Sequence, residues 1–174
     1  MKGKDVILGL LKTRGGLTGY QINELVQTQL SHFYNGGFGM IYPTLKKLEN
    51  EGLVYKEHIN QQEKPNKNVF YITKKGTEVF KDAVNQKTEH EILNSDFLVK
   101  LYFGESLEGG KEREFLNEEL LRKKSALNGL KTNIFKWETN GISEYQKFTV
   151  DYGIAYYEAI IKHIEDKLNE LNLE

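Results

Sequence analysis

Seven apolar residues near the C-terminus follow one another at alternating spacings of four and three residues, without interruption. They are Val150, Ile154, Tyr157, Ile161, Ile164, Leu168 and Leu171. This spacing places all seven along one side of a long helix, and another helix must cover that side. The covering helix can come from a second copy or from the same chain, because helical bundles within one chain have the same repeat. We expect a dimer contact, and packing within the chain is the alternative.

The rest of the second half is also helical in its pattern. No proline follows Pro65, and apolar residues recur at spacings of three and four. We predict one helix from about Lys74 to Phe103 and another from about Lys111 to Trp137. Residues 76–174 are therefore predicted to form an all-α dimerisation region, which could also bind an effector.

The first 75 residues have a different organisation, in which glycines separate short helical segments. The apolar spacing predicts helices from about Lys4 to Arg14, from about Gly19 to Gln29, and over a third segment that ends near Glu51. Pro43 lies inside this third segment, where it removes a backbone hydrogen bond. The third helix is therefore expected either to start late or to bend near its beginning.

Two segments rich in β-branched and aromatic residues follow, at 53–59 and 69–73, with a polar stretch between them. They predict an antiparallel hairpin. Three short helices followed by a hairpin is the order of a winged helix-turn-helix, whose third helix enters the major groove of DNA. We therefore predict a mainly α fold, with an α+β winged helix-turn-helix DNA-binding domain at 1–75 joined to the all-α region.

Charge is unevenly distributed along the chain, although the net charge is only −1. Through Lys75 there are 11 Lys and Arg against 6 Asp and Glu, a net charge of +5. The remainder holds 13 against 19, a net charge of −6. Because phosphates attract basic surfaces, the first 75 residues are the part expected to bind double-stranded DNA.

The candidate DNA-binding residues lie at the start of the second helix, on and beside the third helix, and at the hairpin tip. In that order they are Thr18 and Tyr20; Asn35, Tyr42, Lys46 and Lys47; and Lys64, Asn66 and Lys67. Tyr42 and Lys46 are four residues apart and share a helix face, which would look into the groove. The first and last groups would contact phosphates, or the minor groove in the case of the hairpin. Capping, a solvated helix face and protection of a sheet edge are the respective alternatives.

The second half is rich in aromatic residues that could line a pocket for a flat apolar effector. The candidates for this role are Phe97, Tyr102, Trp137 and Tyr152. Packing in the core and at the dimer contact is the alternative explanation for them.

Several other kinds of function are disfavoured. The chain has no cysteine, which excludes disulfides and thiolate metal sites and suits a reducing cytoplasm. The four histidines have no metal-ligand spacing, and no nucleophile elbow or phosphate-binding glycine loop occurs. The longest uncharged run is too polar to span a bilayer. We expect a soluble cytoplasmic protein that is not an enzyme and needs neither metal nor cofactor.

Four segments of the chain resemble the PadR family of bacterial regulators. They are Leu17-Thr18-Gly19-Tyr20-Gln21-Ile22, Met40-Ile41-Tyr42-Pro43-Thr44-Leu45, Glu51-Gly52-Leu53-Val54 and Phe70-Tyr71-Ile72-Thr73. The tyrosine-proline pair inside a helix is the most specific of these features. The sequence departs from the family pattern at the glycine-rich residues 37–39 and at Asn68, where a basic residue is common.

The resemblance implies a dimeric repressor whose C-terminal helices pair with the first helix of the partner. It also implies a DNA affinity that a small molecule often lowers. We therefore expect a transcriptional repressor that binds a palindromic operator as a homodimer, since one helix-turn-helix alone reads too few base pairs. A winged-helix adaptor that binds protein and no DNA is the alternative.

Overall fold

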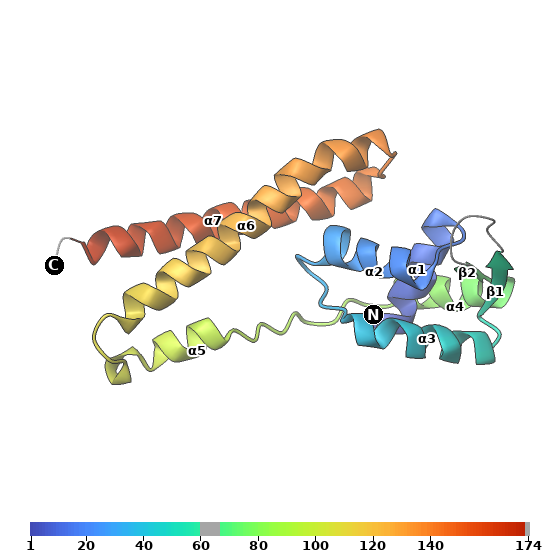
Figure 1. Ribbon diagram of the computed structural model, residues 1–174, viewed down its shortest axis with the longest axis horizontal. Helices are drawn as coiled ribbons and strands as arrows, with labels where there is room; N and C mark the ends of the chain where they lie inside the picture. Colours follow the sequence, from blue (N-terminus) through green and yellow to red (C-terminus); the bar gives the residue numbers. More distant parts are fainter. Residues whose placement is uncertain (60–66, 173–174) are drawn as a thin grey trace. The chain divides into compact units, whose positions relative to one another are not determined.

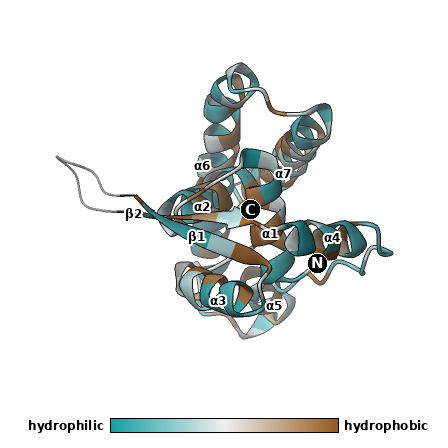
Figure 2. Cartoon of the chain, turned by 90° about the vertical axis from the view of Figure 1, so that its right-hand side faces the viewer, coloured by the Kyte–Doolittle hydropathy of each residue, from teal (hydrophilic) through white to brown (hydrophobic). Residues whose placement is uncertain are grey.

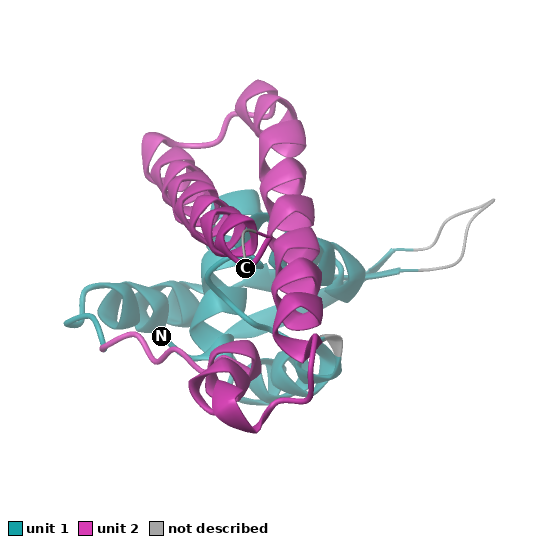
Figure 3. Ribbon diagram, turned by 90° about the vertical axis from the view of Figure 1, so that its left-hand side faces the viewer, with its two compact units in different colours: residues 1–89 teal, residues 90–174 magenta. Residues whose placement is uncertain are grey.

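The computed structural model describes residues 1–59 and 67–172 of the chain (Figure 1). The chain divides into two compact units, Met1–Glu89 and His90–Glu174 (Figure 3). Each unit has its own hydrophobic core. Among the described residues, no helix is long and apolar enough to cross a membrane. The predicted functional division after residue 75 stays a prediction.

Within the described residues, the first unit contains four α-helices, a π-helical turn and a hairpin. In chain order these are α1 (Gly3–Arg14), α2 (Gly19–Leu25), the π-helical turn η1 (Val26–Leu30), α3 (Phe38–Asn50), β1 (Val54–Ile59), β2 (Lys67–Ile72) and α4 (Lys74–Val84). The two strands are antiparallel and pair from Val54 with Ile72 to Ile59 with Lys67. Leu17 and Phe70 exchange backbone hydrogen bonds of 3.1 and 2.8 Å, which tie the segment before α2 to the hairpin.

The core of the first unit is formed by α1, α2, α3 and the hairpin. Its largest fully buried side chains are Ile7, Leu8, Leu11, Ile22, Ile41, Leu45, Leu48 and Val54. Burial of each such side chain contributes about 1.5 to 3 kcal/mol relative to its exposure. The helical members recur every three or four residues, so each helix buries one side and presents the other to solvent. Figure 2 shows this alternation of hydrophobic and hydrophilic residues along α3.

The second unit consists, over its described residues, of three α-helices and one 3-10 turn. They are α5 (Asp96–Tyr102), the 3-10 turn η2 (Gly104–Ser106), α6 (Lys111–Thr139) and α7 (Glu144–Glu170). A short turn joins α6 to α7, and the two long helices lie side by side (Figure 1). Leu130 and Trp137 of α6 pack with Val150, Tyr157 and Ile161 of α7 to form the core of this unit.

The predicted single helix from about Lys74 to Phe103 is wrong. The structure has α4, an irregular segment from Asn85 to Asn94, and then α5, whose N-cap is Ser95. Residues 85–91 are all polar, so two turns of helix there would have no apolar side chain to bury. The Ser95 hydroxyl accepts a hydrogen bond of 3.2 Å from the amide of Leu98, which starts a new helix.

The other predicted elements are present. The third helix begins at Phe38 and continues through Pro43, so it does not start late. The second helix ends as an α-helix at Leu25 and continues as the π-helical turn. The predicted fold class, a winged helix-turn-helix with an all-α C-terminal region, is confirmed.

Candidate nucleic-acid interface

Helix α3 has two opposite faces. Ile41, Leu45 and Leu48 are each 1% exposed and anchor the helix in the core. The other face presents Tyr42 and Lys46 to solvent, as their spacing of four residues predicted. The core therefore fixes the orientation of α3, and the polar face is available to a ligand.

Gly19 places Tyr42 next to the start of α2. A Cβ added to Gly19 would lie 2.7 Å from the nearest ring carbon of Tyr42 and 3.0 Å from its hydroxyl oxygen, so the ring lies directly against the glycine backbone. Tyr42 nevertheless stays 50% exposed. Sequence reasoning missed this contact. The only indication in the sequence was Gly19 itself, because glycine is a poor helix former and it occupies the first helical position after Thr18.

Thr18 and Tyr20 lie at the N-terminus of α2, as predicted. The Thr18 hydroxyl accepts a hydrogen bond of 3.2 Å from the Gln21 amide, and the Gln21 side chain accepts one of 2.9 Å from the Thr18 amide. This reciprocal cap accounts for Thr18 without a ligand. Tyr20 is 68% exposed. A role in phosphate contact stays a prediction for both residues.

The remaining helix candidates are exposed. Asn35 lies in the segment that precedes α3, and Lys46 lies on the same face as Tyr42. The ammonium of Lys47 lies 3.9 Å from a carboxylate oxygen of Glu51, one turn later. Because this pair is exposed, it contributes little stability and leaves the lysine accessible.

The hairpin carries the last group of candidates. Lys67 is exposed at the start of β2, whereas Lys64 and Asn66 lie outside the described residues. Asn68, the departure from the family pattern, faces His58 across the strands, with 2.9 Å between its Oδ1 and the His58 Nδ1. Asn68 therefore has a partner on the opposite strand of the hairpin.

An aromatic pair supports the hairpin. The rings of Tyr55 and Tyr71 are stacked with their centroids 5.3 Å apart. A Cβ at Gly16 would lie only 2.2 Å from the Tyr71 ring, so this ring packs on the segment between α1 and α2. Desolvation, and next the nearby Glu57 carboxylate, raise the pKa of Tyr71 above its ordinary value. The Tyr71 hydroxyl is therefore harder to ionise than an ordinary tyrosine hydroxyl, which is itself neutral at physiological pH.

Comparison with known proteins decides what this arrangement is. The model of the PadR-like family of transcriptional regulators matches residues 7–82. The crystal structure of the PadR-like transcriptional regulator BC1756 from Bacillus cereus is 39% identical, has a TM-score of 0.89, and covers 98% of this chain and 96% of its own. This chain belongs to the PadR-like family of transcriptional regulators.

Two further relatives resemble this PadR-like regulator over nearly its whole length. The crystal structure of smu.1604c from Streptococcus mutans is 40% identical with a TM-score of 0.89, and the match covers 97% of this chain and 99% of the other. Bacillus subtilis PadR in complex with operator DNA is 26% identical with a TM-score of 0.80, covering 96% and 97%. The B. subtilis protein is a negative transcriptional regulator, and it has also been solved with p-coumaric acid.

The seven apolar residues from Val150 to Leu171, which we call the apolar seam of α7, pack largely against α6 of the same chain. Val150, Tyr157, Ile161 and Ile164 are buried, and Ile154 packs against the same α6–α7 core. Leu168 and Leu171 are half-buried near the end of the helix. A contact of the seam with a second copy stays a prediction. The five residues from Val150 to Ile164 instead follow the alternative, in which the seam packs within its own chain.

The predicted effector residues lie in different surroundings. Trp137 is 5% exposed in the core of α6 and α7, whereas Tyr102 and Tyr152 are exposed. Phe97 is half-buried and lines a cavity of about 240 Å³ between α5 and α6, together with Ser95, Asp96, Lys100, Phe115, Glu119 and Arg122. Sequence reasoning thus found one residue of this cavity and missed the rest, because the charged members have no distinctive spacing.

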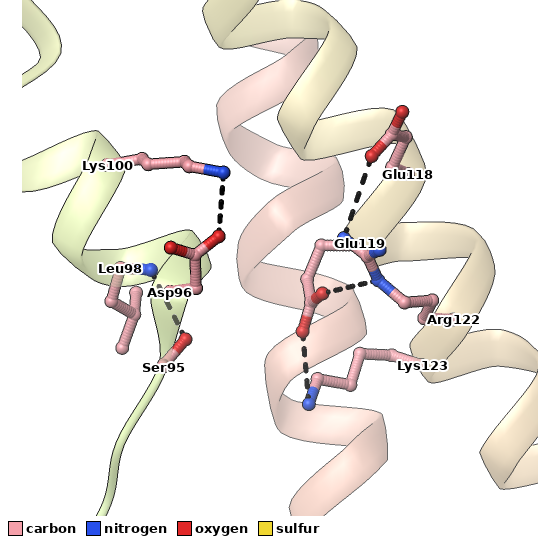
Figure 4. A network of polar contacts seen from close by, with 8 residues as sticks. All are labelled: Ser95, Asp96, Leu98, Lys100, Glu118, Glu119, Arg122 and Lys123. Atoms are coloured by element: carbon pink, nitrogen blue, oxygen red, sulfur yellow. Dashed lines mark hydrogen bonds and ion pairs between the residues drawn. The ribbon is translucent and has the colours of Figure 1, made fainter.

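Several residues that line this cavity form ion pairs, which Figure 4 shows. The Lys100 ammonium lies 2.7 Å from the Asp96 carboxylate and 5.4 Å from the ring centroid of Phe115. On α6, the carboxylate of Glu119 lies 2.9 Å from the guanidinium of Arg122 and 3.1 Å from the ammonium of Lys123. Each of these cations already has a carboxylate partner, so the cavity combines two phenylalanine rings with a polar lining whose charges are paired.

Proposed function

We propose that this PadR-like regulator is a repressor that binds a palindromic operator as a homodimer. The exposed face of α3, with Tyr42 held beside the start of α2 and Lys46 on the same side, carries the proposal. This face would enter the major groove, and the hairpin would lie on the phosphate backbone. The net charge of +5 through Lys75 supports the assignment, as does the operator complex of B. subtilis PadR.

Selection of bound fragments from the genome of the source organism tests the proposal. The purified full-length chain is mixed with sheared genomic DNA, and the recovered fragments are sequenced. We expect enrichment of a site with two-fold symmetry, whose half-sites are separated by about one helical turn, or 10 base pairs. A Lys46→Ala variant run in parallel should lose this enrichment. If the native chain enriches no sequence, the proposal is wrong and the adaptor function becomes the better one.

The homodimer is proposed from a second apolar face of α7. Tyr145, Phe148 and Tyr152 recur at spacings of three and four and are exposed, on the side of α7 away from its buried apolar repeat. Tyr145 and Phe148 are 88% and 68% exposed, values unusual for large aromatic residues that are evenly spaced. A second copy of the chain is the occupant that we propose, because a palindrome requires two symmetric readers.

An effector is proposed for the cavity between α5 and α6. Its aromatic walls, Phe97 and Phe115, suit a small flat molecule, and B. subtilis PadR has been solved with p-coumaric acid. With p-coumaric acid as the probe, we expect a higher Tm for the native chain and weaker operator binding. Phe97→Ala should lose both effects, and Tyr102→Ala, which lies outside the cavity lining, should keep them. An unchanged Tm and operator affinity for the native chain would count against this class of ligand.

A further inference from the structure

The exposed face of α3 begins with a residue that has no side chain. Gly39 lies in the first turn of the helix and is exposed. It precedes Tyr42 by three residues and Lys46 by seven, so all three lie along one side of the helix. The face that we assign to DNA therefore starts with bare backbone.

The fold of the chain gives no reason for a glycine at this position. Gly15 and Gly52 adopt positive φ angles of 76° and 68°, whereas Gly39 does not have a positive φ. A Cβ built on Gly39 meets no heavy atom within 4 Å, in contrast to Gly19 and Gly76, where it would collide with neighbouring atoms. Alanine would thus fit in the free chain without strain, and it forms helices better than glycine does.

Pro43 is a neighbour that could require a flexible residue here. It cannot donate a hydrogen bond to the carbonyl of Gly39, and its ring crowds that carbonyl. If Gly39 served to relieve this crowding, alanine would destabilise the free chain. If Gly39 served a partner instead, alanine would stabilise the free chain and weaken the complex. The two explanations predict opposite signs for the change in Tm.

We propose that Gly39 determines how closely α3 approaches operator DNA. The inference rests on the proposed function, in which this face of α3 enters the major groove. Without a Cβ at its start, the helix backbone itself can contact the DNA, and this brings Tyr42 and Lys46 within reach of the base edges. A side chain at position 39 would hold the helix away from the groove, and a larger side chain would hold it further away.

Gly39→Ala and Gly39→Leu test the inference, with Gly129→Ala as the matched control. Gly129 lies inside α6, and a Cβ built there also meets no atom within 4 Å. We expect both alanine variants to raise Tm by about 1 to 4 °C. Operator affinity should fall about 5- to 100-fold for Gly39→Ala, fall further for Gly39→Leu, and stay at the native value for Gly129→Ala.

The outcomes separate this inference from the proposed function. Failure of the native chain to bind any operator would refute the proposed function itself. If the native chain binds and Gly39→Ala binds equally well, only the inference about Gly39 is overturned. A lower Tm for Gly39→Ala would also overturn it, because Pro43 would then be the reason for the glycine.

Discussion

Individual residues differ in how well the sequence predicted them. Ile41, Leu45 and Leu48 were readable because burial follows from a repeat of three and four residues. The exposed position of Lys46 followed from the same repeat. The contact of Tyr42 with Gly19 was not readable, since it joins residues of two helices whose packing depends on the whole core. The local pattern determines whether a residue faces the core or the solvent. Which residue of another helix it contacts depends on the tertiary structure.

Lys46→Ala should weaken operator binding by about 1 to 3 kcal/mol if the lysine contacts a base edge, and Tyr42→Ala should act in the same direction. Binding to scrambled duplex should fall much less. Lys81→Ala removes the same charge from an exposed position on α4 and is the matched control. Titrations on both duplexes measure these effects, and equal losses on the two would assign Lys46 to the phosphate backbone.

Gly19→Ala should destabilise the first unit by at most about 1 kcal/mol, less than overpacking of a core, because the new methyl group would collide with a half-exposed Tyr42 ring that can shift. The double variant Gly19→Ala with Tyr42→Ala should be little less stable than Tyr42→Ala alone. Denaturant unfolding of the three variants forms a double-mutant cycle. If the two single effects simply add, Gly19 and Tyr42 do not interact as described.

Among the elements, long patterned segments were predicted best. The boundaries of α1 and α6 lie within a few residues of the predicted ones, and the apolar repeat that predicted the last helix lies within α7 and its C-cap, because these patterns extend over several turns. The break between α4 and α5 was missed, since absence of proline was taken to indicate helix continuity. What ends α4 is a polar stretch with nothing to bury, and Ser95 then starts α5. The continuation of α3 through Pro43 was left open because the surrounding core decides it.

The hairpin should increase the affinity for DNA without affecting which DNA sequence is preferred. Lys67→Ala and Lys64→Ala are expected to weaken binding to all DNA alike and to reduce the slope of log affinity against log salt by about 0.9 for each lost phosphate contact. Lys46→Ala should nearly preserve that slope. Titrations at several salt concentrations separate these signatures. Loss of discrimination at an unchanged slope would mean that the hairpin reads bases.

At the scale of the whole molecule, sequence reasoning recognised two kinds of structure in one chain. It could not decide what covers the α7 seam, because the same repeat fits a neighbouring helix of either origin. In the structure, α6 of the same chain covers most of it. The aromatic face on the other side of α7 was not singled out, and Tyr152 was considered as a residue of the effector pocket.

Phe148→Glu and Tyr152→Glu should shift the dimer towards monomer, with the dissociation constant rising about 30-fold or more for each change. Helix content and Tm should be largely retained, because both side chains are exposed. Asn128→Glu, which adds the same single charge at an exposed position on α6, is the control and should leave the dimer intact. Sedimentation of the full-length variants measures this. A dimer that survives both changes at micromolar concentration would place the contact elsewhere.

The packing of Tyr42 on Gly19 constrains how a regulator of this design could evolve a new operator. A mutation that replaces Tyr42 would alter both the base contact that we propose for it and the junction between α2 and α3. Lys46 and Asn50 lie on the same exposed side of α3 and can be exchanged with little effect on the core. Descendants of such a repressor would therefore diverge in target sequence first through positions 46 and 50, while position 42 changes last.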